Sequence, residues 1–395
     1  MPMSEKLALF DDGIRRVAVA LPFDIDRLID EWSGLRSPMI RSRPDSFTRD
    51  EWAYLITFLD PAWLKRVFES HFGKPSPATD GKITAILRPR GRVAVWLPNN
   101  VSLLGPLTLI LVSLSGNPMW LKTGSHSDDL TAAFLEFCRT ALPGGPLANY
   151  LLDRVRLESF DRDDPRVREM AATSAVRIVF GTDEASAAID ALPHPAGSLS
   201  FAFSDRRSEA WIEPSSVDDQ VLETLAKVFA IYGQAGCTSP RRVVVIDGTA
   251  ESARQLRDRL LALWRRAIPQ DPPMNVASAN IMTRQWAAIS GWSAALTDRH
   301  GAVLAVGDAS LPELEGTAVL PIVALTLDEA IAQLPENIQT IGHAVAHPLE
   351  ERWLRMLATT SIKRFVPVAR MHHFGPVWDG FQFWRMLFEE VEVAS

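Results

Sequence analysis

The sequence of 395 residues has little cysteine, no long basic run and no long apolar segment. Two cysteines, Cys138 and Cys237, are too few for a disulfide framework, and their scarcity predicts a cytoplasmic protein. No run of Lys and Arg exceeds two residues and the net charge is −7, which argues against a nucleic-acid partner. The most apolar stretch, Val101–Leu114, is too short to span a membrane, and the charged N-terminus lacks the apolar core of a signal peptide.

Several common site motifs are also missing. The chain contains no Gly-x-Ser-x-Gly motif, no phosphate loop of the Gly-Lys-Ser/Thr type and no Gly-x-Gly-x-x-Gly fingerprint. His343 and His347 are four residues apart, but no glutamate stands in the metalloprotease position and Pro348 follows at once. His372 and His373 have no carboxylate or thiolate neighbour at ligand spacing. The sequence therefore predicts no metal site.

What is present is the composition of a globular protein, with 47% hydrophobic and 23% charged residues, and a length that allows two or three domains. Short β-branched runs alternate with stretches of helical periodicity, which predicts an α/β fold. The expected strands are Val93–Trp96, Trp120–Lys122, Val176–Phe180, Leu199–Phe203, Arg242–Ile246, Val303–Val306 and Val319–Leu325. The expected helices are Leu103–Leu114, Asp129–Thr140, Asp183–Ala191, Val217–Ile231, Ser252–Ala267 and Leu327–Gln333.

Changes in composition near residues 73–81, 194–197 and 348 divide the chain. We expect an α-helical lead-in over residues 1–80, a first α/β domain over residues 81–205 and a second over residues 206–345. The aromatic segment over residues 346–395 is expected to return and complete the first α/β domain.

The most informative loop covers residues 232–240, between an expected helix and an expected strand. Gly233 and Gly236 allow the backbone to turn tightly beside Cys237. A cysteine on such a loop can present its sulfur and its own N–H group to a cleft, as a nucleophile that forms a tetrahedral adduct requires. The alternative is a small buried hydrophobe, because cysteine is among the most buried residue types. Cys138, within a helical pattern, fits that alternative better.

Three expected strand ends carry polar or small residues. Asn100 follows the strand Val93–Trp96 and can donate its amide hydrogen to a developing oxyanion, although asparagine is also a common turn residue. Lys122 ends the next strand, where it either meets a nucleotide or remains a solvated cation. Gly181 and Thr182 follow a third strand and would let a pyrophosphate approach a helix N-terminus, but most such turns bind nothing.

Five short motifs follow one another along the chain, and their order is informative. They are Pro98-Asn99-Asn100-Val101, Gly116-Asn117 with Lys122, Phe180-Gly181-Thr182, Gly233-Gln234 with Cys237, and Glu313-Leu314-Glu315-Gly316 before Asp328-Glu329-Ala330-Ile331. In this order they resemble the aldehyde dehydrogenase superfamily. The Cys237-Thr238-Ser239-Pro240 context and the late segments Arg364–Pro367 and Trp378–Phe381 look most like its LuxC-type acyl-CoA reductases, the fatty-acid reductase branch.

The resemblance covers about residues 85–385. It implies an aldehyde dehydrogenase-like fold, in which residues 81–205 form a Rossmann-like cofactor domain, residues 206–345 form the catalytic domain, and the active site lies between them. It also implies that Cys237 is the nucleophile and that Asn100 binds the oxyanion together with the N–H group of Cys237.

The same resemblance implies that Lys122 and the turn at Gly181 and Thr182 hold a nicotinamide nucleotide, with Glu313 as the ribose-binding glutamate. Members that prefer NAD often carry a glutamate at the position of Ser125. A carboxylate there would repel a 2′-phosphate, so the serine favours NADPH, with NADH as the alternative.

Oxidising members of the superfamily carry a Glu-Leu-Gly-Gly stretch upstream of the cysteine, whose glutamate activates water. The corresponding region here, Ser200–Arg206, has no such motif. Without a hydrolytic base, an acyl-enzyme on Cys237 would survive until it is reduced.

These features predict an oxidoreductase of fatty-acid metabolism that reduces an acyl thioester of coenzyme A or of an acyl-carrier protein to the aldehyde through an S-acyl-cysteine. The alternatives are an aldehyde dehydrogenase acting oxidatively, a cofactor-independent cysteine acyltransferase, and a non-catalytic acyl-carrier-binding subunit. A homo-oligomer or a complex with a biosynthetic partner is expected by analogy alone.

Overall fold

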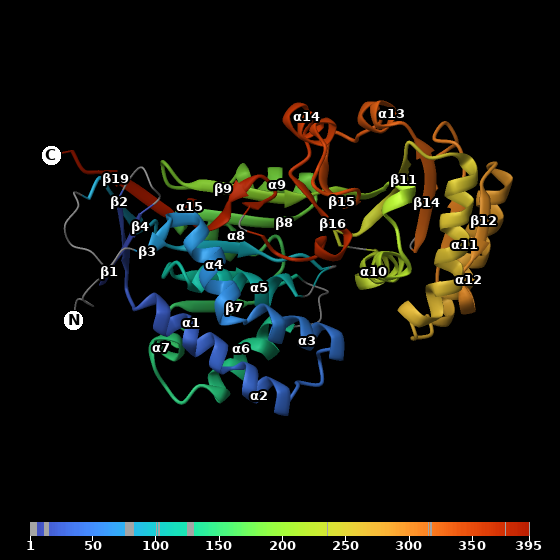
Figure 1. The fold of residues 1–395 in the computed structure, drawn as a ribbon. Coiled ribbons are helices and arrows are strands. Elements are labelled where there is room, and N and C mark those ends of the chain that lie inside the picture. Colours follow the sequence, from blue (N-terminus) through green and yellow to red (C-terminus); the bar gives the residue numbers. More distant parts are fainter. Residues whose placement is uncertain are drawn as a thin grey trace. The chain divides into compact units, whose positions relative to one another are not determined.

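A computed structural model describes residues 6–11, 16–75, 83–99, 101, 103–124, 130–234, 236–314, 316, 318–375 and 377–394. The chain forms two compact units, each built around a largely parallel sheet (Figure 1). Unit 1 comprises Met1–Ser204 and Gly375–Ser395, and unit 2 comprises Asp205–Phe374. Unit 2 is therefore an insertion into unit 1 along the sequence.

Unit 1 contains a five-stranded parallel sheet in the order β7-β6-β5-β8-β9. Its strands are β5 (Val93–Trp96), β6 (Met119–Lys122), β7 (Val155–Glu158), β8 (Val176–Gly181) and β9 (Leu199–Ser204). The connecting helices are α5 (Leu104–Ser113), α6 (Leu130–Ala141), α7 (Pro146–Asp153), α8 (Pro165–Thr173) and α9 (Asp183–Asp190). The order in which the chain adds strands reverses between β5 and β8, since β6 and β7 lie on one side of β5 and β8 and β9 on the other. Open α/β sheets bind ligands at such a point, outside the carboxyl ends of the strands.

A second sheet in unit 1, in the order β19-β4-β2-β1-β3, joins the two ends of the chain. Its strands are β1 (Lys6–Asp11), β2 (Arg16–Leu21), β3 (Lys74–Pro75), β4 (Ala85–Pro89) and β19 (Phe388–Glu392). The helices that precede β4 are α1 (Ile25–Gly34), α2 (Arg36–Arg41), α3 (Arg49–Phe58) and α4 (Pro61–Phe72). The region expected to be a helical lead-in, residues 1–80, thus also contributes strands to this sheet. One of them, β2, pairs in parallel with β4.

The C-terminal return is anchored by Trp384 on α15 (Phe383–Met386). This side chain is fully buried, its Nε1 donates a hydrogen bond of 2.6 Å to the carbonyl oxygen of Leu111, and its ring packs against Phe68. A short hairpin of β17 (Val377–Trp378) and β18 (Phe381–Gln382) precedes α15. The return therefore completes the core of unit 1.

Unit 2 contains a seven-stranded sheet in the order β12-β13-β14-β11-β10-β15-β16, in which β12 is antiparallel to its neighbour. The strands are β10 (Arg207–Ile212), β11 (Pro240–Ile246), β12 (Ser293–Leu296), β13 (Val303–Val306), β14 (Val319–Leu325), β15 (Ile338–Ala344) and β16 (Arg364–Pro367). The helices are α10 (Asp219–Ala230), α11 (Ala250–Ala267), α12 (Met274–Ile289), α13 (Leu327–Ala332) and α14 (Glu351–Thr359).

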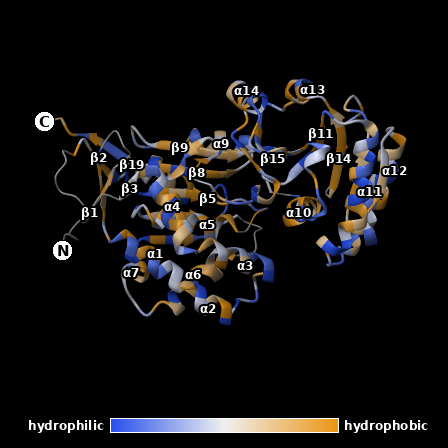
Figure 2. Ribbon diagram, in the orientation of Figure 1, coloured by the Kyte–Doolittle hydropathy of each residue, from blue (hydrophilic) through white to orange (hydrophobic). Residues whose placement is uncertain are grey.

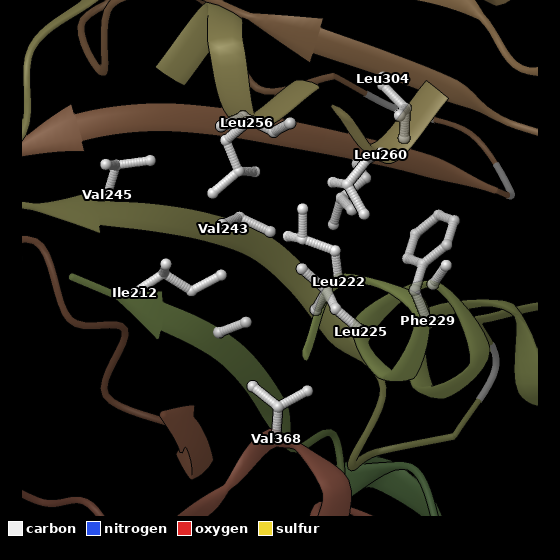
Figure 3. Close-up of a cluster of buried hydrophobic side chains, with 14 of the residues drawn as sticks. Ile212, Leu222, Leu225, Phe229, Val243, Val245, Leu256, Leu260, Leu304 and Val368 are labelled. Atoms are coloured by element: carbon white, nitrogen blue, oxygen red, sulfur yellow. The ribbon is translucent and has the colours of Figure 1, made fainter. Parts of the chain in front are cut away.

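Both faces of this sheet are covered by helices. On one face, α10 and α11 pack Leu222, Phe229 and Leu260 against β11 and β13 (Figure 3). On the other face, α14 places Trp353 and Met356 in a second core. Hydrophilic and hydrophobic residues alternate along α11, as an amphipathic helix over a sheet requires (Figure 2).

All the strands and helices expected from the sequence are present, within a few residues at their ends. The interior strands β10 and β15 were not expected, since they contain polar residues that are buried. Glu209 on β10 is held by an ion pair of 2.8 Å with Arg242 and by the indole N–H of Trp211. Residues 346–374 lie in unit 2, because β16 pairs in parallel with β15. Within the described residues, no helix combines the length and the apolar character needed to cross a membrane.

Candidate active site

The loop with Cys237 lies between a 3-10 turn, η2 (Ile231–Gln234), and β11 at the centre of the unit 2 sheet. The carbonyl oxygen of Cys237 accepts a hydrogen bond of 2.7 Å from the hydroxyl of Ser208 on β10. The N–H of Ser239 donates 2.9 Å to the carbonyl of Gly236, which closes the turn. The side chain of Cys237 is exposed, so it is not packed beneath the sheet. Its backbone is thus fixed while its sulfur is accessible.

Cys138 provides the contrast. It is fully buried within α6 of unit 1, and burial raises the pKa of its thiol far above the usual value. Because the thiolate is the nucleophilic form of cysteine, Cys138 is chemically inert where it stands.

Gln234 anchors the start of the Cys237 loop, residues 232–240. Its side chain is 2% exposed, and its Nε2 donates to the carbonyl oxygens of Val319, at 2.9 Å, and Pro240, at 3.2 Å. Its Oε1 accepts 3.2 Å from the N–H of Val319. The backbone of Gln234 is left-handed, with φ of 66°, which is uncommon for a residue with a side chain. These bonds hold the loop to β11 and β14 in that conformation.

A second contact holds the end of the loop and was missed by the sequence analysis. The hydroxyl of Thr238 lies 2.6 Å from Nδ1 of His372, whose Nε2 lies 2.8 Å from the carbonyl oxygen of Val228. In the sequence, His372 drew notice only as a histidine without metal-ligand neighbours. A separation of 134 residues hides such a contact from any local pattern.

Glu313 lies at the same edge of the unit 2 sheet as the Cys237 loop. Its exposed carboxylate forms an ion pair of 2.8 Å with Arg207, the first residue of β10. Arg207 directly precedes Ser208, the residue whose hydroxyl binds the carbonyl of Cys237. Glu313 is therefore linked to the Cys237 loop through Arg207 and Ser208, and its carboxylate is paired with the Arg207 guanidinium.

In unit 1, Lys122, Gly181 and Thr182 all lie at the carboxyl edge of the parallel sheet. Lys122 ends β6 and Gly181 ends β8, with β5 between these strands. Thr182 caps α9 by accepting a hydrogen bond of 3.2 Å from the N–H of Ala185. Burial lowers the pKa of Lys122, and its Nζ lies 5.3 Å from the centre of the Phe160 ring.

Asn100 and Ser125 lie outside the described residues. Their neighbours show that the loops after β5 and β6 approach each other closely. A Cβ atom on Gly124 would lie 1.9 Å from Oδ1 of Asn99, so a larger residue at that position would have to displace the Asn99 side chain.

The described residues of unit 1 fit a nicotinamide nucleotide. A parallel sheet whose strand order reverses between β5 and β8, and a glycine before the capped N-terminus of α9, are elements that dinucleotide sites use. The half-buried Lys122 on β6 adds a cation at the same edge of the sheet.

Solved structures that resemble this chain include aldehyde dehydrogenases. The chain resembles succinic semialdehyde dehydrogenase from Streptococcus pyogenes, determined with NADP+, at 14% identity over 94% of this chain and 90% of that one, with a TM-score of 0.64. Aldehyde dehydrogenase 21 from Physcomitrella patens, determined with succinate, gives 11% identity over 93% and 85%, with a TM-score of 0.68. An oxidoreductase from Marinobacter aquaeolei gives 13% identity over 93% and 84%, with a TM-score of 0.66.

At these identities the likeness establishes the aldehyde dehydrogenase fold and no more. Compared by sequence with curated proteins, the chain has no significant match. Among protein-family models, the one described as Acyl-CoA reductase (LuxC) matches residues 52–388, which is most of the chain. The chain therefore belongs to the LuxC acyl-CoA reductase family and is an oxidoreductase.

Proposed function

We propose that the protein reduces an acyl thioester to the aldehyde with NADPH, through an acyl group carried on Cys237. The observation that carries the proposal is the exposure of this sulfur on a turn whose backbone is fixed on both sides, in a chain of the acyl-CoA reductase family. The family description names the thioester of coenzyme A as the substrate class, and an acyl-carrier protein offers the same reacting bond.

In the first step, the Cys237 thiolate attacks the carbonyl carbon of the thioester. The carbonyl oxygen gains negative charge, and we assign the N–H of Cys237 and the amide of Asn100 as its hydrogen-bond donors. The tetrahedral adduct then collapses, the bond to the carrier sulfur breaks, and the carrier thiol leaves. One thioester replaces another, so the site supplies position and oxyanion stabilisation, each donor contributing on the order of 3 kcal/mol.

In the second step, the acyl group on Cys237 is reduced and released as the aldehyde. NADPH, when bound, supplies the hydride that reduces the carbonyl carbon. Lys122, Gly181 and Thr182 are assigned to hold this nucleotide, and Glu313 to hold its ribose after release from Arg207. We assign the preference for NADPH to Ser125 together with Lys122, since neither repels a 2′-phosphate.

The experiment that tests the proposal traps the acyl-enzyme. The protein is incubated with acyl-CoA thioesters of different chain length, without NADPH, and examined by intact-protein mass spectrometry and peptide mapping. We expect one acyl group on Cys237 in the wild-type protein and in Cys138→Ala, and none in Cys237→Ala. Once NADPH is added, the first two proteins should release aldehyde. A Cys237→Ala protein that makes aldehyde at the wild-type rate would reject the mechanism.

A further inference from the structure

The imidazole of His372 lies at the nucleophile turn in one defined protonation state. Its Nε2 faces the carbonyl oxygen of Val228 at 2.8 Å, and a carbonyl oxygen only accepts hydrogen bonds. Nε2 therefore carries the proton, which leaves Nδ1 with its lone pair. That lone pair accepts the hydroxyl hydrogen of Thr238 at 2.6 Å. Both nitrogen atoms are engaged.

His372 is also neutral. Burial lowers its pKa to about 4, and the neighbouring His373 and Arg364 act in the same direction. At neutral pH the ring is therefore an uncharged base whose proton-accepting atom, Nδ1, is held by Thr238. A neutral imidazole whose ring nitrogen has a lone pair can accept a proton from water as a general base.

The position of the ring is set by the backbone around it. The guanidinium of Arg364 donates to the carbonyl oxygens of Met371, at 3.1 Å, and His373, at 2.7 Å, on either side of His372. Met371 is fully buried, and a Cβ atom on Gly342 would lie 2.1 Å from its Sδ. The segment is therefore packed against β15, which fixes the ring of His372 beside Thr238.

We propose that Thr238, by occupying Nδ1, keeps His372 from acting as a general base on water, so that the acyl group on Cys237 survives until it is reduced. This inference rests on the proposed function. Hydrolysis would require a water oxygen to add to the thioester carbonyl while a base accepts a water proton. The bond from carbon to sulfur would then break, releasing the acid and returning the proton to the sulfur of Cys237. Because the Thr238 hydroxyl occupies Nδ1, His372 is not available to accept the water proton in these steps.

The test compares acyl-enzyme lifetimes in the full-length protein. Wild type, Thr238→Val and Thr238→Ser are acylated with a long-chain acyl-CoA, cleared of excess substrate and kept without nucleotide. The acyl group on Cys237 is followed by intact-protein mass spectrometry, and free acid is measured in parallel. Valine has the shape of threonine without its hydroxyl, so we expect its acyl-enzyme to decay at least about tenfold faster. Serine retains the hydroxyl and should decay as wild type does.

A double variant shows which group is responsible for faster decay. In Thr238→Val/His372→Gln, glutamine provides an amide donor for the carbonyl of Val228 but no imidazole base. The decay should return to near the wild-type rate, whereas decay of Thr238→Val alone should slow as acid protonates the ring. Equal lifetimes in Thr238→Val and wild type, or decay of the double variant as fast as that of Thr238→Val, would overturn the inference. If the wild-type protein carries no acyl group at all, the proposed function is wrong, and the inference that rests on it is wrong as well.

Discussion

The buried imidazole of His343 makes the stability of the folded protein depend on pH. It lies on β15, is 4% exposed, and stacks on Phe365 with ring centres 4.3 Å apart. Among the described residues its Nδ1 has no hydrogen-bond partner. Burial, with a smaller effect from His347, lowers its pKa to about 4. An unfolded chain takes up this proton near pH 6.5, so the folded state loses stability as the pH falls from about 6.5 toward 4.

Replacing His343 by leucine should weaken this pH dependence. Between pH 7.5 and pH 5, the loss of unfolding free energy should be smaller than in wild type by about 2 kcal/mol, because the neutral side chain binds no proton in either state. Urea denaturation at the two pH values measures the difference. Burial also lowers the pKa of His372, so the stability of the His343→Leu protein should still depend on pH to some extent. The exposed His194→Gln should behave as wild type, and an unchanged slope in His343→Leu would contradict the assignment.

At the scale of elements, hydrophobic pattern predicted the structure wherever the buried face is apolar. The strand β5 is four buried apolar residues, and its bounds could be predicted without error. The strands β10 and β15 could not be predicted from hydrophobic pattern, because they bury Glu209 and His343. Burial of Glu209 depends on an ion pair with a residue distant in the sequence, and burial of His343 depends on stacking against an aromatic ring. The same limit applies to the Cys237 loop. Its glycines and Cys237 could be recognised locally, whereas its anchors could not.

The anchoring role of Gln234 gives a prediction for this loop. Gln234→Glu keeps the shape but turns a carboxylate oxygen toward the carbonyl oxygens of Pro240 and Val319, in place of the amide donor. We expect a loss of about 3 kcal/mol of unfolding free energy, since buried acceptors then face one another. Acylation of Cys237 should also slow. Denaturant unfolding and the acylation rate report the two effects.

The matched control is Gln333→Glu, at an exposed amide that binds Arg242. It should shift stability by less than about 0.5 kcal/mol, as surface substitutions usually do. If Gln234→Glu were equally mild, the loop would have to be held by other contacts.

At the scale of the whole molecule, unit 2 interrupts unit 1 between Ser204 and Gly375. The two ends of unit 1 at this interruption lie side by side. Phe203 at the end of β9 and Trp378 on β17 have ring centres 4.9 Å apart. The sequence indicated that the C-terminal segment returns, but the residue at which the return begins depends on the pairing of β16 with β15, which no local pattern reveals.

Because these ends are close, unit 1 should fold without unit 2. We expect residues 1–204, joined to residues 375–395 by about six Gly and Ser residues, to unfold cooperatively, since such a linker spans on the order of 13 Å. Residues 1–204 alone should not, because they lack Trp384, which fills the core beside Phe68, and β19, which pairs with β4. Circular dichroism during thermal unfolding distinguishes the two.

The joined fragment also isolates the assigned nucleotide residues of unit 1 from those of unit 2. It retains Lys122, Gly181 and Thr182 but not Glu313, so NADPH should still bind, more weakly than to the full chain, and NADH should bind more weakly again. Quenching of tryptophan fluorescence during titration measures both. A folded fragment that binds neither nucleotide would show that the carboxyl edge of the β7-β6-β5-β8-β9 sheet is not the cofactor site, and the roles assigned to Lys122 and Thr182 would have to be withdrawn.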